Sequence, residues 1–130
     1  MKLLLDTHVF LWYLNRSKRL SPAIHNAIRD PQNAVYFSVV SLWESTLKYQ
    51  LGKLPLPQPP DQYLPQERQR HQIAALALDE LSVSKLMHLP NLHRDPFDRM
   101  LICQALAHNL TFVTVDEIIR AYSVPIFDAA

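Results

Sequence analysis

Short apolar segments alternate with helical patterns along this chain of 130 residues, and that alternation constrains the fold more than any other feature. The segment KLLLD at 2–6 is a continuous apolar run ended by an acid, as expected for a strand buried on both faces. Segments 34–38, 73–78, 110–115 and 124–127 are the other predicted strands. Parallel strands need helical crossovers, so the alternation predicts a three-layer α/β/α sandwich around a mainly parallel sheet.

Helices are predicted between these strands from apolar spacing and capping residues. Ser21 followed by Pro22 is a helix start, and Gly52 is a helix stop at the position after the C-cap. The proline-rich segment 53–66 is expected to be an ordered surface loop with room for a short helix near Asp61. The predicted helices cover 7–15, 22–29, 39–52, 79–89, 96–109 and 116–122.

Composition excludes several classes of protein. The length fits one domain over 1–130, and 13 Lys and Arg against 12 Asp and Glu leave no global field that would attract nucleic acid. The single Gly52 excludes a P-loop and a dinucleotide fingerprint, which both need several glycines. The single Cys103 excludes an internal disulfide and fits a reducing cytoplasm. Asp6 and His8 interrupt the N-terminal apolar run, so we expect neither a signal peptide nor contact with a membrane.

Four acidic residues are expected at one edge of the predicted sheet. Asp6 and Asp116 each end a strand, whereas Glu44 and Asp98 each lie in the first turn of a helix that faces the same edge. Each acid alone has a structural explanation as a helix cap, Glu44 through a capping box with Ser41. Four crowded carboxylates would repel one another, however, and a hard divalent cation such as Mg²⁺ or Mn²⁺ would neutralise them.

The segment HRDPFDRMLICQA at 93–105 contains two acids with different expected roles. Asp95 is predicted to be the N-cap of the following helix, because Pro96 then occupies the first helical position, where its missing N–H costs nothing. Asp98 falls at the third helical position, where a carboxylate meets the positive end of the helix dipole. Position alone therefore explains both acids structurally, and only the rest of the chain favours a functional role.

Four segments together resemble one protein family. These segments are LLLDTHVFLW, SLWE, HRDPFDRMLICQA and FVTVDEIIRAYSVPI, and their order along nearly the whole chain is that of PIN-domain ribonucleases, specifically VapC-like toxins of bacterial type II toxin–antitoxin pairs. Asn109 and Ser123 stand where relatives often have glycine. Asn tolerates the left-handed conformation, so a turn at 109 is still expected.

The resemblance implies a Mg²⁺-dependent endoribonuclease, with Mn²⁺ as the alternative metal. The implied catalytic and metal-binding acids are Asp6, Glu44, Asp98 and Asp116, and the implied supporting or substrate-binding residues are Thr7, Arg94, Asp95, Arg99 and Thr114. His8 and His93 are interpreted as structural, because neither has an evident partner in the sequence. The expected partners are an RNA substrate, a cognate antitoxin and a second copy of the chain.

Two other functions compete with this interpretation. A catalytically inactive PIN-like module would bind RNA or a partner without cutting it, and the presence of all four acids argues against it. A haloacid-dehalogenase-type phosphatase also begins with a strand and an aspartate, but it needs a second acid two residues later, where this chain has His8. A metal-dependent cleavage assay would separate the nuclease from the inactive module.

Overall fold

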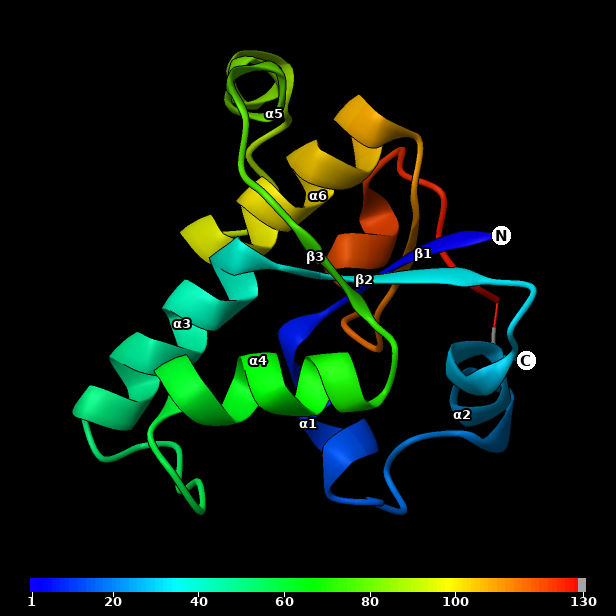
Figure 1. Ribbon diagram of the computed structural model, residues 1–130. Coiled ribbons are helices and arrows are strands. Elements are labelled where there is room, and N and C mark those ends of the chain that lie inside the picture. Colours follow the sequence, from blue (N-terminus) through cyan, green and yellow to red (C-terminus); the bar gives the residue numbers. More distant parts are fainter. Residues whose placement is uncertain (129–130) are drawn as a thin grey trace.

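The computed structural model describes residues 1–128 and has a parallel four-stranded sheet at its centre. Its strands are β1 (Lys2–Leu5), β2 (Ala34–Ser38), β3 (Ala74–Leu76) and β4 (Thr111–Val113), in the order β3-β2-β1-β4 (Figure 1). Leu4 of β1 is in register with Tyr36 of β2 and with Phe112 of β4. Strands β2 and β4 lie on opposite edges of β1, so the order in which strands are added to the sheet reverses between β1 and β4. Parallel sheets bind ligands at the carboxyl ends of the strands at such a point.

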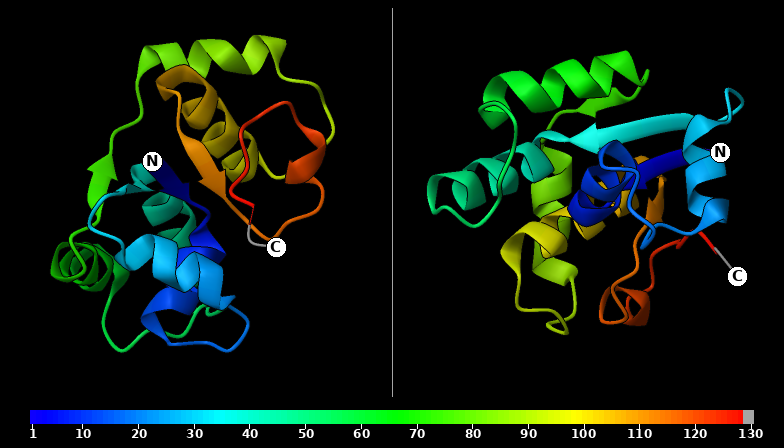
Figure 2. Two further views of the ribbon diagram at one scale, coloured as in Figure 1. Left: turned by 90° about the vertical axis from the view of Figure 1, so that its right-hand side faces the viewer. Right: turned by 90° about the horizontal axis from the view of Figure 1, so that it is seen from below.

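Helices cover both faces of this sheet (Figures 1 and 2). Helices α1, α2 and α4 lie on one side, and α5, α6 and the C-terminal turn η2 lie on the other (Figure 1). The predicted three-layer α/β/α architecture is therefore confirmed. The bounds are α1 Thr7–Leu14, α2 Pro22–Arg29, α3 Val39–Gln50, α4 Pro60–Arg70, α5 Glu80–Lys85, η1 Leu86–His88, α6 Pro96–His108 and η2 Ile119–Ala121.

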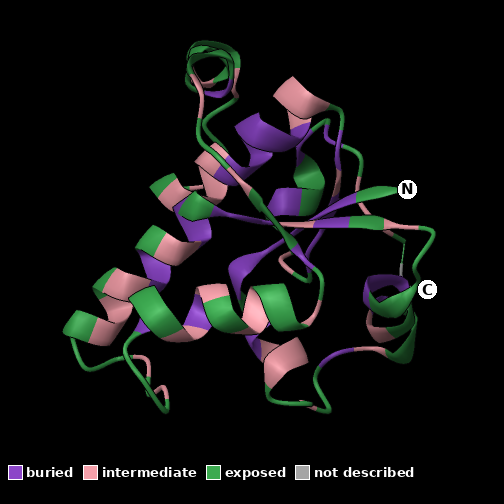
Figure 3. Ribbon diagram, viewed as in Figure 1, coloured by how far each residue is buried: buried purple, intermediate pink, exposed green. Residues whose placement is uncertain are grey.

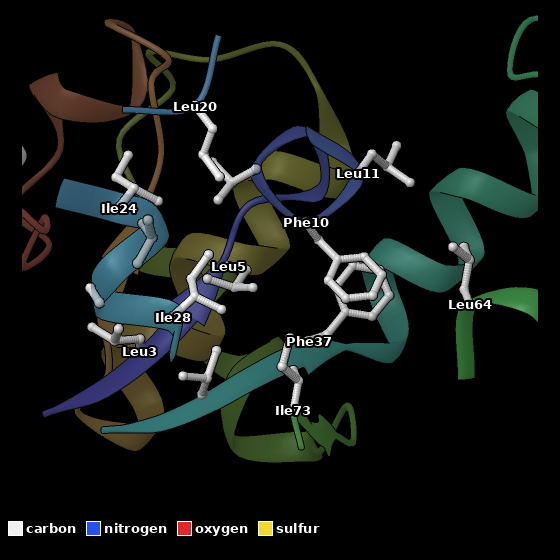
Figure 4. Packing of buried hydrophobic residues seen from close by; sticks show 14 residues of the cluster. Leu3, Leu5, Phe10, Leu11, Leu20, Ile24, Ile28, Phe37, Leu64 and Ile73 are labelled. Carbon is white, nitrogen blue, oxygen red and sulfur yellow. The ribbon is translucent and has the colours of Figure 1, made fainter. Parts of the chain in front are cut away.

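Strand β1 divides the interior into two apolar clusters. Leu3 and Leu5 point to the cluster shared with α1 and α2, and Leu4 points to the cluster shared with α6. All three leucines are fully buried, which explains the continuous apolar run (Figure 3). In the first cluster, the rings of Phe10 and Phe37 stack with their centroids 4.0 Å apart and link α1 to β2 (Figure 4).

The proline-rich segment is more helical than expected. Helix α4 begins at Pro60 and continues to Arg70, so the helix expected near Asp61 is confirmed but is longer than expected. Pro60 occupies a first-turn position, where its missing N–H costs nothing. Pro65 lies inside the helix and removes one backbone hydrogen bond, but the complete burial of neighbouring Leu64 offsets this loss.

The C-terminal segment is less regular than expected. The predicted helix over 116–122 is reduced to the turn η2, and the predicted strand over 124–127 is a single parallel bridge between Ile126 and Phe112. Pro125 accepts a hydrogen bond from the Phe112 N–H at 2.8 Å but has no N–H of its own to extend the ladder. Between residues 1 and 128, no helix is both long and apolar enough to cross a bilayer.

Candidate metal centre

Asp6 lies where β1 ends beside β4, and its surroundings hold it rigidly. Its backbone N–H donates to the Val113 carbonyl at 2.9 Å, which extends the β1–β4 pairing by one residue. Its buried carboxylate accepts hydrogen bonds from the Thr7 N–H at 2.8 Å and from the Thr114 hydroxyl at 2.7 Å. Thr114 also accepts the Asp116 N–H at 3.1 Å, so one threonine links the acids of both strands.

Glu44 reaches the same edge from α3. One carboxylate oxygen accepts a hydrogen bond from the Thr7 hydroxyl at 2.7 Å, and the other forms an ion pair with Lys48 at 2.6 Å. The expected capping box is wrong, because α3 begins earlier: Ser38 is its N-cap, Glu44 lies in the second turn, and Ser41 instead contacts Thr7. Glu44 is almost completely buried without serving as a cap, so its position is not explained by helix initiation.

Asp95 and Asp98 occupy the predicted positions at the start of α6. Asp95 is the N-cap, and its carboxylate accepts the backbone N–H groups of Phe97 at 2.8 Å and Asp98 at 3.3 Å, with Pro96 at the first helical position. The Asp98 side chain is only 15% exposed. The capped first turn therefore holds Asp98 in a fixed position at the sheet edge.

Burial and the surrounding acids both affect the pKa of Asp98. Its pKa is raised to about 8, first by burial and then by the negative charges of Asp6, Asp95, Glu44 and Asp116. Burial also raises the pKa of Asp6, with Glu44 adding to the rise and the Thr114 hydrogen bond opposing it. The predicted acids are therefore close enough for their charges to affect one another.

His93 lies against two of the acids, so the expectation that this histidine has no positioned partner is wrong. Its Nε2 lies 3.0 Å from a carboxylate oxygen of Asp116 and 3.3 Å from one of Asp98. Its Nδ1 accepts the Asp95 N–H at 3.0 Å, which leaves Nε2 as the donor in the hydrogen bond with Asp116. For Asp116, burial acts to raise the pKa, but the His93 hydrogen bond and nearby backbone N–H groups lower it overall.

The contact of His93 with the acids depends on Tyr122, which is distant in sequence. Its hydroxyl accepts the backbone N–H groups of Leu92 at 3.0 Å and His93 at 2.8 Å, across about 30 residues of sequence. This contact sets the backbone that aims the imidazole. Lys48 was also missed, although its spacing of four residues from Glu44 on one helix is a readable signal.

The two predicted arginines do not join the acid cluster. Arg99 donates to the Pro90 carbonyl at 3.0 Å and lies 3.3 Å from the Tyr122 hydroxyl, so it braces the segment before α6. Arg94 is exposed, and no ion pair or hydrogen bond of its side chain is found within residues 1–128. Neither guanidinium therefore neutralises the four acids.

The donor set at this edge suits a hard divalent cation. Carboxylate oxygens are the preferred ligands of Mg²⁺ and Mn²⁺. Ligand atoms of His93, Asp98 and Asp116 lie within 4.8 Å of one another. Because His93 presents its Nε2 proton, the carboxylates rather than the imidazole are the available ligands.

Comparison with known proteins agrees with this geometry. A PIN domain family model matches residues 3–125. Ribonuclease VapC16 of Mycobacterium tuberculosis is 36% identical over 52 residues, an alignment that spans 40% of this chain and only 37% of that relative's length.

Solved structures share the fold at low sequence identity. A chain of VapBC2 from Rickettsia felis, solved with a promoter DNA fragment, has a TM-score of 0.72 and 17% identity, covering 98% of both chains. A chain of DNA-bound VapBC from Salmonella typhimurium has a TM-score of 0.68 and 17% identity, covering 100% of this chain and 99% of that one. Together with the family model that matches nearly its whole length, these findings show that the chain belongs to the PIN domain family.

Proposed function

We propose that this protein is a divalent-metal-dependent endoribonuclease and the toxin of a type II toxin–antitoxin pair. The observation that carries the proposal is the gathering of acids around Asp98. Together with burial, the charges of Asp6, Asp95, Glu44 and Asp116 raise the pKa of Asp98 to about 8. Repulsion between these carboxylates would not stabilise a purely structural cluster, whereas the same concentration of negative charge would favour the binding of a cation. The VapC16 relative and the VapBC structures support the assignment to ribonuclease toxins.

Each part of the site has a role in this proposal. Asp6, Glu44, Asp98 and Asp116 would hold Mg²⁺ or Mn²⁺, which when bound activates water and neutralises charge on a phosphodiester. Thr7 and Thr114 fix the orientation of Glu44 and Asp6 through hydrogen bonds at 2.7 Å. Asp95 supports Asp98 from the helix start, and Arg94 is free to contact a flanking phosphate.

Cleavage of RNA with and without metal tests this proposal. We expect purified protein to cut single-stranded RNA with Mg²⁺ or Mn²⁺ and to stop when EDTA is added. RNA binding without cleavage under either metal would instead support the catalytically inactive module.

The proposed partners are an antitoxin and a second copy of the chain. Along α3, the apolar side chains of Val39, Trp43, Leu47 and Leu51 recur every four residues and are exposed. Trp43 packs edge-on against Phe97 at 4.9 Å, which joins this exposed stripe to the start of α6. A continuous apolar stripe of this kind is typical of protein interfaces.

A further inference from the structure

A pocket with cationic lining lies at the opposite end of α1 from the acids. It has a volume of about 490 Å³ and is lined by Tyr13, Arg16, His25, Arg29 and His71. A second pocket of about 330 Å³ adjoins it and shares Tyr13, Arg29 and His71. Helix α1 begins beside Asp6 and has eight residues, which corresponds to about 12 Å of helix between the acids and this pocket.

Hydrogen-bond donors dominate the lining of the larger pocket. Among residues 1–127, no ion pair or hydrogen bond involves the guanidinium group of Arg16 or Arg29. The Tyr13 ring is held edge-on between His25 and His71, at centroid distances of 5.2 and 5.1 Å. No carboxylate lines this pocket, so its donors are free to bind an anion.

Two acids, Asp30 and Glu67, lie close to the larger pocket but do not line it. Asp30 lines the adjoining smaller pocket, where its carboxylate accepts the Gln32 N–H at 2.9 Å. Glu67 lies 3.9 Å from His71 and 3.5 Å from Arg70. These acids leave Arg16 and Arg29 unpaired, so the positive charge of the larger pocket remains available.

Between the two sites, the Trp12 ring lies beside the imidazole of His8 and the guanidinium of Arg19. The rings of His8 and Trp12 lie 6.1 Å apart, and the Arg19 guanidinium lies 6.0 Å from the Trp12 ring. His8 is exposed and Trp12 is half-buried. An aromatic ring beside a cationic guanidinium can bind single-stranded nucleic acid by stacking on a base and by contacting a phosphate.

We propose that the pocket of Tyr13, Arg16, His25, Arg29 and His71 binds a backbone phosphate of the RNA substrate, away from the cleavage site. This inference rests on the proposed function, since it concerns the same substrate. The strand would run from the acid cluster past Trp12 to the pocket. RNA is favoured over an acidic peptide because the route combines unpaired arginines with an aromatic ring that can stack on a base.

Binding of labelled RNA by the full chain in EDTA tests the pocket without cleavage. The probes are a fluorescein-labelled trinucleotide and a dodecanucleotide of the same base composition. The test variant is Arg16→Gln/Arg29→Gln, and the charge-matched control is Lys53→Gln/Lys85→Gln, which replaces two exposed lysines outside the pocket. Fluorescence anisotropy is measured at several salt concentrations.

We expect the test variant to bind the dodecanucleotide about tenfold more weakly than the control, with a salt slope reduced by about 1 to 2, as for lost phosphate contacts. The trinucleotide also carries backbone phosphates, so its binding should weaken in the test variant as well. Equal dodecanucleotide binding by both variants would overturn the proposal, as would weaker binding of a polyglutamate peptide without a change for RNA. A wild type that binds through the pocket but cuts no RNA would refute only the nuclease assignment.

Discussion

Asp98 and Asp116 share His93 as a neighbour, yet their pKa values are shifted in opposite directions. Burial and the other acids raise the pKa of Asp98 to about 8, whereas the more exposed Asp116 has its pKa lowered overall, chiefly by its hydrogen bond with His93. The cluster therefore holds a proton at Asp98 near neutral pH when no metal is bound. A bound cation would displace that proton.

The pH dependence of stability tests this assignment in EDTA. The pKa of Asp98 is raised from 3.8 to about 8 on folding, so the stability it contributes is complete below about pH 4 and is lost as the pH rises through about 8. Asp98→Asn cannot ionise, so its free energy of unfolding should increase relative to that of wild type over this range. Asp116→Asn should show no such gain, because the pKa of Asp116 is lowered. Parallel stability–pH curves for wild type and Asp98→Asn would contradict the assignment.

His93 should act by positioning the carboxylates rather than by binding metal. Its Nε2 proton faces Asp98 and Asp116, so a glutamine, which also carries a donor, should preserve much of the arrangement. We expect His93→Ala to weaken Mn²⁺ binding, measured by calorimetry, by about tenfold, a typical effect of losing a group that orients metal ligands. His93→Gln should recover most of that loss. Equal loss in both variants would show that the imidazole itself is required.

At the scale of elements, the bounds of helices and strands were predicted correctly where local capping residues and apolar runs determine them. Helix α2 and strand β2 match their predicted bounds, because Ser21 accepts the Ile24 N–H and the centre of segment 34–38 is Val-Tyr-Phe, which is β-branched and aromatic. Helix α4 was underestimated because its anchor is the long-range burial of Leu64, which local proline counting cannot show. At Pro125, by contrast, the cause could be read from the sequence, because a proline has no N–H with which to extend the predicted strand beyond one bridge.

The site was predictable to the extent that it follows from topology. Asp6 and Asp116 end neighbouring parallel strands, so their proximity follows from the order of the sheet. The role of Asp95 as a cap follows from Pro96. The aim of the His93 ring could not be predicted, because Tyr122 sets its backbone from a distant part of the chain.

At the scale of the whole molecule, the exposed stripe on α3 predicts self-association. Val39, Trp43, Leu47 and Leu51 would otherwise remain in contact with water. Light scattering at micromolar concentration should give the mass of a dimer for wild type and that of a monomer for Trp43→Ser/Leu47→Ser. The exposed Leu81→Ser/Met87→Ser pair on α5 and η1 serves as the matched control and should remain dimeric. A monomeric wild type would refute the dimer.

Metal-dependent RNA cleavage by Asp98→Asn and Asp95→Asn, at equal concentrations of folded protein, tests the central claim most directly. Asn caps helices about as well as Asp, so Asp95→Asn should change stability by at most a few tenths of a kcal/mol and lower activity only modestly. Asp98→Asn should remain folded and lose nearly all Mg²⁺-dependent cleavage, because the acid on which the cluster converges would be gone. Wild-type activity in Asp98→Asn, or an inactive Asp95→Asn, would contradict the four-carboxylate metal site.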